Sequence, residues 1–264
     1  MTQQYSAGAD ALSALNATNE GGGSGAEFAS FKSGTSYKVR VLGTADLIRF
    51  YSYGIFKKVN SFVAKDPSVK NARGFAESNF TPWDLASNYY SDLKRKAEDS
   101  GQTAKVEEYK AEAGKYRAKE RYALGFIDLE TGEPIIVDLS KKQAQGVHAV
   151  IKKYEKKLSK LAFELSKNGS STSTVVSLSP VIDMDEDLTD KERKNFAKYA
   201  DKEFDMALFN GLLFEADEKQ QIENLVAAGF DITLIGLSIG GAATQADESD
   251  VEIGTVEDAQ EFEF

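Results

Sequence analysis

The chain has 264 residues, a mass of 28.8 kDa, no cysteine and a single histidine, His148. This length allows one core with appendages, and the absence of cysteine excludes disulfides and thiolate zinc sites. No apolar run approaches the roughly 18 residues of a membrane span. Residues 1–19 have neither the basic nor the apolar region of a signal peptide. We therefore expect a cytoplasmic protein with no membrane contact.

The net charge of −10 is distributed unevenly along the chain. Residues 1–36 carry a net −2, residues 37–160 a net +8, and residues 161–264 a net −16. An asymmetry of this kind indicates a basic, nucleic-acid-binding body with an acidic arm. The acidic average therefore does not exclude a nucleic-acid partner.

The first 35 residues are rich in alanine, glycine, serine and asparagine and include the run Gly21-Gly22-Gly23-Ser24-Gly25. Such a composition buries too little apolar surface to offset the entropy of ordering, so a flexible N-terminal arm is predicted. A phosphate-binding glycine loop would need a preceding strand and a Gly-Lys-Ser/Thr ending, which this run lacks.

Strand-like alternation begins at Tyr37, where Tyr37, Val39 and Val41 would face one side and Lys38 and Arg40 the other. The elements predicted next are a strand region broken at Gly54 (Ile48–Ala64), a long connection (Asp66–Pro82), two charged helices (Trp83–Asp99 and Thr103–Ala113) and a strand (Lys115–Leu129).

The second half of the chain starts with the best-defined local signal, a hairpin. The strands Lys115–Leu129 and Pro134–Leu139 flank Glu130-Thr131-Gly132-Glu133. Ser140 and Gln143 then form a capping box for a helix whose apolar residues recur from Val147 to Leu165. The remaining predictions are a strand (Thr174–Val181), a short helix after Thr189, a helix (Asp217–Ala228) and a last strand (Phe230–Leu237), with order ending after Gly240.

Aromatic and basic residues interleave in the basic segment of the chain. A protein that binds single strands needs both residue types, because cations contact the phosphates while exposed rings stack on the bases. Each stacked base contributes roughly 1–3 kcal/mol of binding energy. The predicted DNA-binding residues are Lys38, Arg40, Arg49, Tyr51, Tyr53, Lys57, Lys58, Lys65, Arg73, Trp83, Lys115, Tyr116, Arg117, Lys119, Arg121 and Tyr122. The alternative is that many of the rings, among them Phe50, Phe56, Phe62 and Phe126, belong to the core and the lysines are ordinary solvated charge.

The end of the sequence is acidic and aromatic. From Asp247 onward there are eight carboxylates and no basic residue, and the chain closes with Glu261, Phe262, Glu263 and Phe264. Solubility does not require aromatic residues, whereas a basic pocket with an apolar floor would hold such a peptide. These four residues are therefore the predicted partner-binding residues, on an otherwise disordered tail.

Two apparent metal motifs fail on spacing. Asp183, Asp185 and Asp187 begin like a calcium loop, but the glycine position is Leu188 and the closing glutamate position is Lys194. His148 has no companion ligands in a zinc-protease motif. No metal, cofactor or catalytic residue is predicted, and a nuclease would need a converging carboxylate cluster that the sequence does not indicate.

The order of these parts resembles the single-stranded DNA-binding proteins of tailed bacteriophages and, loosely, the T-even helix-destabilising proteins. The resemblance rests on Tyr37–Val41, the run Arg49–Val63, the run Lys115–Tyr122 with its hairpin, and the Phe-ending acidic tail. It implies an OB-fold core, binding of single strands with little sequence preference, and a tail that recruits replication and recombination proteins. The zinc ligands and basic N-terminal arm of the T-even proteins have no counterpart here.

The predicted architecture is mainly β with α insertions, an α+β fold with an OB-like barrel and flanking helices. Its parts are a flexible arm (1–35), a single-stranded DNA-binding domain (36–239) and a disordered acidic tail (240–264). The predicted function is non-enzymatic single-stranded DNA binding in phage replication, recombination and repair, with a tail that recruits partners and competes for the DNA groove. The alternative is a scaffolding protein whose tail docks partners and which binds no DNA.

Overall fold

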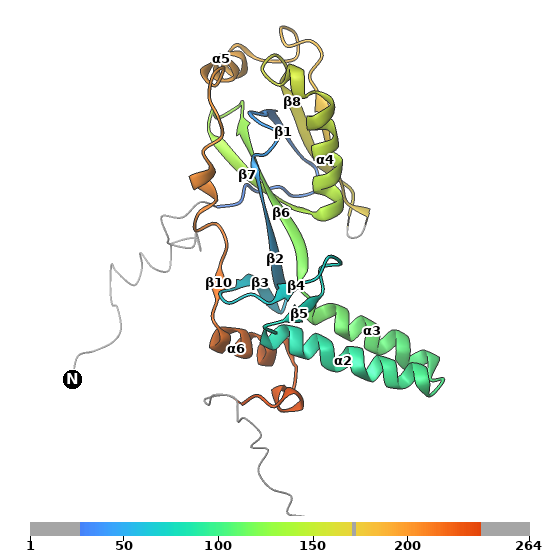
Figure 1. The fold of residues 1–264 in the computed structure, drawn as a ribbon. Helices are drawn as coiled ribbons and strands as arrows, with labels where there is room; N and C mark the ends of the chain where they lie inside the picture. Colours follow the sequence, from blue (N-terminus) through green and yellow to red (C-terminus); the bar gives the residue numbers. More distant parts are fainter. Residues whose placement is uncertain (1–26, 171–172, 239–264) are drawn as a thin grey trace, which may run out of the picture.

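A computed structural model describes residues 27–170 and 173–238, which form two lobes joined by a long strand pair (Figure 1). The strands are β1 (Thr35–Arg40), β2 (Leu47–Ile55), β3 (Val59–Ala64), β4 (Val69–Lys70), β5 (Ala76–Ser78), β6 (Lys119–Asp128), β7 (Pro134–Ser140), β8 (Phe163–Asn168), β9 (Val175–Pro180) and β10 (Glu215–Ala216). The helices are α2 (Pro82–Asp99), α3 (Thr103–Tyr116), α4 (Lys141–Lys153), α5 (Asp190–Lys198) and α6 (Glu218–Ala228), with 3₁₀ turns η1 (Glu155–Lys157), η3 (Met206–Phe209) and η4 (Ile232–Ile235).

Eight strands form one large sheet in the order β10-β3-β2-β6-β1-β8-β9, with β7 also paired to β6. Every pair in it is antiparallel except β10 with β3, and β4 and β5 form a separate hairpin. The prediction of a mixed fold with a large sheet and flanking helices is confirmed. Within residues 27–170 and 173–238 the end strands β10 and β9 do not pair, so these pairings do not describe a closed barrel.

Strand β6 connects the two lobes. Its first half pairs with β2, its last residues pair with β1, and its other edge pairs with β7. The register places Arg49 opposite Tyr122 and Tyr51 opposite Glu120. Because side chains alternate along a strand, these four share one face of the sheet, and Arg121 lies on the opposite face.

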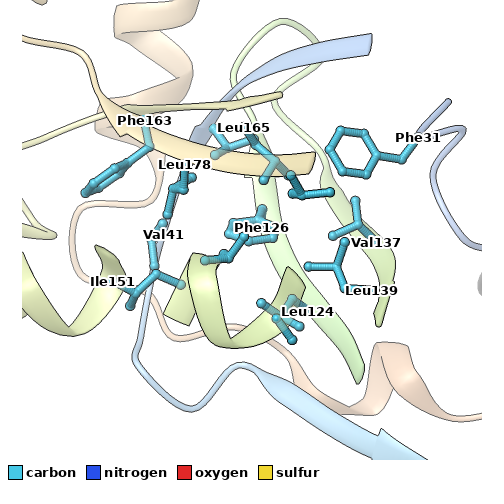
Figure 2. Packing of buried hydrophobic residues seen from close by; sticks show 14 of the residues in the cluster. Phe31, Val41, Leu124, Phe126, Val137, Leu139, Ile151, Phe163, Leu165 and Leu178 are labelled. Atoms are coloured by element: carbon cyan, nitrogen blue, oxygen red, sulfur yellow. The ribbon is translucent and has the colours of Figure 1, made fainter. Parts of the chain in front are cut away.

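The upper lobe has its own core, in which side chains from β1, β6, β7, β8 and β9 meet helix α4 (Figure 2). Phe126, Val137 and Leu165 are almost completely buried there. Phe31 also enters this core, and the Ala29 amide donates to the Ile136 carbonyl at 2.8 Å. Ala29 and Phe31, which the sequence analysis assigned to the flexible arm, therefore pack on the folded body.

Helix α4 begins at Ser140 with the predicted capping box, in which the Ser140 hydroxyl accepts from the Gln143 amide. The prediction that its apolar repeat continues to Leu165 is wrong. The helix ends at Lys153, and Phe163 and Leu165 point into the core from strand β8 instead. Apolar residues two apart fit a strand, and the helical spacing of earlier leucines hid that change of period.

The lower lobe is held by an aromatic core between the β2–β3 hairpin and helices α2, α3 and α6. Trp83 is fully buried, and its ring centroid lies 5.3 Å from that of Phe62 and 5.7 Å from that of Tyr116. Helix α3 extends to Tyr116, so strand β6 starts at Lys119, four residues later than the predicted start at Lys115. The strand predicted at Phe230–Leu237 is instead the turn η4, which the Asp231 side chain caps by accepting from the Thr233 amide.

A third apolar layer covers the other face of the sheet. Phe204, Phe209 and Leu212 pack on Ala123 and Ile136. The Phe204 ring lies so close to β6 that a Cβ at Gly125 would be 2.3 Å from it, so any larger residue there would force the ring to move. The C-terminal part of the described chain therefore buries one sheet face along the joining strands and leaves the opposite face for other contacts.

Replacing Phe31 by alanine should lower the free energy of unfolding by about 3–5 kcal/mol, the usual cost of removing a buried phenylalanine. Urea denaturation measures this loss. The exposed neighbour Lys32 is the control, since Lys32→Ala should change stability by less than about 0.5 kcal/mol. Equal stability of the two variants would show that the segment before β1 does not belong to the core.

Candidate nucleic-acid interface

Four of the predicted DNA-binding residues are buried, namely Arg40, Tyr53, Trp83 and Tyr116, and this corrects the prediction for them. The Arg40 guanidinium lies 4.0 Å from the Phe196 ring centroid and donates to the Phe196 carbonyl. Arg40 therefore attaches α5 to the sheet. The three rings form the aromatic core of the lower lobe, where no face is open to a base.

Three further predicted cations lie apart from one another. Lys38 donates to the Asp187 carbonyl and pairs with Glu192 at 3.4 Å, so it holds the approach to α5. Lys115 pairs with Glu112 along α3, and Lys65 is exposed just past the end of β3. The predicted partner-binding residues Glu261, Phe262, Glu263 and Phe264 lie outside the described residues.

Five predicted residues do come together where the two lobes join. With Phe75 they form a set that we call the waist surface: Arg49, Tyr51, Arg73, Phe75, Arg117 and Tyr122. Strand β2 supplies Arg49 and Tyr51, and β6 supplies Tyr122 opposite Arg49. The β4–β5 hairpin reaches over β2, so that a Cβ on Gly74 would lie 3.6 Å from the Tyr51 hydroxyl. The hairpin turn therefore lies against Tyr51, and Arg73 and Phe75 flank Gly74 in that turn.

Each half of the waist surface contains a guanidinium group against an aromatic ring. The Arg49 guanidinium carbon lies 5.6 Å from the Tyr51 centroid, and that of Arg117 lies 4.7 Å from the Phe75 centroid. The Arg49 side chain is 59% exposed and Phe75 is 42% exposed. Planar guanidinium groups stack on aromatic faces and also contact phosphates, so both pairs can receive a base and its backbone.

An acidic residue organises the upper edge of this surface. Glu120 accepts from Lys141 at 2.8 Å and from the Tyr122 hydroxyl at 2.8 Å, and it lies 4.0 Å from Arg49. The hydrogen bond from Lys141 lowers the pKa of Glu120 and keeps it ionised. Two cations and one carboxylate leave a net positive charge beside Tyr122.

A buried ion pair fixes the β4–β5 hairpin to the rest of the lobe. Lys70 of β4 lies 3.0 Å from Asp84 of α2, and both side chains are almost fully buried. Tyr53 donates to the same carboxylate at 3.0 Å, and Thr81 completes the capping box of α2. A hairpin of two short strands is rarely stable alone, so the ion pair between Lys70 and Asp84 holds the β4–β5 hairpin in place over Tyr51.

The ionisation of Asp84 depends on those partners. Burial alone would raise the pKa of this carboxyl, but the neighbouring Ser68 hydroxyl, the Lys70 ammonium and the Thr81 hydroxyl outweigh burial, and the pKa is lowered. A pKa below the unfolded value of about 3.9 stabilises the fold at higher pH. That contribution is lost as the pH falls through the folded-state pKa.

The other predicted cations lie on the opposite side of β2, around its hairpin with β3. Lys57, Lys58, Lys119 and Arg121 are found there, and Arg121 makes two hydrogen bonds to Asp138, at 2.8 and 2.7 Å. Two exposed rings accompany them, Phe56 at 88% and Phe214 at 61%. Sequence reasoning left Phe56 as a core candidate and missed Phe214, since nothing local distinguishes an uncovered ring from a buried one.

Sequence reasoning also omitted Lys70 and Lys141 and did not select Phe75 as a site residue. Phe75 belongs to the run of aromatic and basic residues and lies two residues after Arg73. That position could have marked it as a candidate DNA-binding residue. The roles of Lys70 and Lys141 depend on partners 14 and 21 residues away. No local pattern marks such a pairing.

Comparison of the sequence with protein-family models and with curated proteins finds no match to either. In residues 27–170 and 173–238, no group of three or more His, Cys, Asp or Glu side chains is placed to hold a metal ion. None of the helices in the described part of the chain is long and apolar enough to cross a membrane. Functional inference therefore depends on the geometry of the waist surface.

Replacing Lys70 by methionine should destabilise the protein by about 3 kcal/mol or more, because it leaves the Asp84 carboxylate buried without its cation. Chemical denaturation measures the effect. The matched control is Lys110→Met on α3, where the exposed pair with Glu107 contributes at most about 1 kcal/mol. Equal stability of both variants would contradict a structural role for the buried pair.

Proposed function

We propose that this protein binds single-stranded DNA without enzymatic activity and that the waist surface is its main contact. The observation that carries the proposal is the pairing of Arg49 with Tyr51 and of Arg117 with Phe75 on adjoining elements. Single-strand binders combine cations along the backbone with rings that accept bases. The waist surface offers both.

The overhanging hairpin favours a single strand over a duplex. Tyr51 is half-buried beneath the β4–β5 hairpin, so a base reaches its ring only after leaving a stack. Stacking of this kind has little sequence preference, since every base has an aromatic face. The proposal therefore includes sequence-independent binding.

The upper lobe supports an OB-like interpretation. Its pairings β1–β6, β6–β7, β1–β8 and β8–β9 follow an OB-type order, with α4 between the third and fourth strands of the unit. Helix α4 packs on both β7 and β9, and Gln143 donates to the Thr174 carbonyl at 3.4 Å. We propose a partly open OB barrel with α4 at its gap. The long insertion after β2 then supplies the β4–β5 hairpin, in a loop position that OB-folds use for oligonucleotides.

The biological role follows from the resemblance to phage single-stranded DNA-binding proteins and from the charge of the sequence. The protein would act in replication, recombination and repair, in the cytoplasm of the host cell. Its acidic segment with Phe262 and Phe264 would recruit partner proteins and compete with DNA for the basic surface.

Alanine at Arg49 or Arg117 should weaken binding to oligo(dT), because each change removes a phosphate contact. Each variant should also make the dependence of log K on log salt shallower by about 0.7. Fluorescence anisotropy titrations over a range of salt concentrations measure both effects. Trp83 emission is a poor probe, since that ring is buried.

The control for these variants is Lys110→Ala, which removes one positive charge from α3, away from the waist surface. This variant should show the same dependence of log K on log salt as the unmodified protein. If Arg49→Ala and Arg117→Ala behave like this control, the DNA-binding site lies elsewhere.

Truncation after Gly240 should tighten binding to oligo(dT) at low salt, because it removes eight carboxylates that compete with phosphate. The difference should shrink as salt screens the charges, since the Debye length falls to about 8 Å at 0.15 M. Paired titrations of the full and truncated chains test this. Identical affinities at low salt would contradict the proposal that the acidic segment competes with DNA for the basic surface.

A further inference from the structure

A cavity of about 230 Å³ lies between α4 and the strands that form the waist surface. Its walls are Leu47, Tyr122, Leu124, Lys141, Ala144, Gln145 and His148. Tyr122 belongs both to this cavity and to the waist surface, where it stands opposite Arg49. The cavity therefore adjoins the path along which we place the DNA backbone.

The cavity is small and mainly apolar, with polar side chains at its edge. The walls are mainly apolar, from Leu47, Leu124 and Ala144, and Gln145 and Lys141 lie at the exposed edge. Pockets for drug-sized ligands usually occupy roughly 300–1,000 Å³, so this space is small for them.

The polar groups around the cavity are fixed by other contacts. His148 makes a hydrogen bond through Nε2 with the Thr44 carbonyl at 3.1 Å, which orients the imidazole. The Tyr122 hydroxyl is held by Glu120, and the same carboxylate holds Lys141. The ring of Tyr122 is thus presented in a defined position beside two cations, Lys141 and Arg49.

From this juxtaposition we infer that the cavity is a nucleobase pocket, which takes one base turned out of the strand bound at the waist surface. The phosphate of that nucleotide lies against Arg49 and Lys141, and its base enters between Leu47 and Ala144 beside Tyr122. The inference rests on the proposed function and extends it. It also gives a second reason for single-strand selectivity, since a paired base cannot enter.

Ala144→Leu tests the pocket, because Ala144 is a buried wall residue and the larger side chain fills the space. The variant should bind oligo(dT) about tenfold more weakly, a loss within the range for one stacked base. The salt slope should not change, since the phosphate contacts remain. An abasic backbone of the same length should bind this variant and the unmodified protein equally.

Ala149→Leu is the matched control, as Ala149 is an exposed residue on the same helix and not a wall of the cavity. It should bind both ligands like the unmodified protein. If Ala144→Leu does not fold, Ala144→Val is the substitute. It should lose a smaller part of the affinity for oligo(dT) and keep the affinity for the abasic backbone.

Two results would overturn the pocket. One is an Ala144 variant that binds oligo(dT) as tightly as the control, and the other is a variant that loses equal affinity for oligo(dT) and for the abasic backbone. Either result leaves single-strand binding intact. By contrast, failure of the unmodified protein to bind oligo(dT) at low salt would remove the proposed function itself.

Discussion

The antiparallel register between β2 and β6 is the constraint on which the candidate interface depends. It places Arg49 opposite Tyr122 and Tyr51 opposite Glu120 on the face that lies between the two cores. A slip of one residue in either strand would move that strand's two side chains to the opposite face, which Phe204 and its neighbours cover. The same strands are anchored in the apolar core of each lobe, so packing at both ends fixes the register of the polar residues between them.

The second requirement is the position of the β4–β5 hairpin, and a buried charge supplies it. Burying Lys70 and Asp84 costs desolvation energy, which is offset only because Tyr53 and Thr81 complete the hydrogen bonds of the carboxylate. The Lys70 ammonium also lies 5.7 Å from the Tyr51 ring centroid. An apolar pair could stabilise the lobe equally well, whereas the ion pair joins β4, α2 and β2 in one arrangement. The rings and guanidinium groups are therefore held in place before any ligand arrives.

Much of the fold could be predicted from the sequence where local chemistry decides it. The capping box at Ser140 and the turn around Gly132 marked element boundaries correctly, because they involve neighbouring residues. Predictions failed where tertiary packing decides the outcome. Arg40 alternates with apolar residues like a surface cation, yet α5 covers it, and Trp83 is buried by α6 and β3. For the same reason the sequence could indicate a basic, aromatic surface but could not separate the waist residues from those around Phe56.

Photocrosslinking would show whether single-stranded DNA contacts the waist surface, because it reports which rings touch the strand without altering the protein. An oligonucleotide of 5-iododeoxyuridine crosslinks to aromatic side chains that stack on it, and peptide mass spectrometry identifies them. Crosslinks are expected at Tyr51, Phe75 and Tyr122, the three rings of the waist surface. Crosslinks confined to Phe56 and Phe214, on the other side of the β2–β3 hairpin, would contradict it.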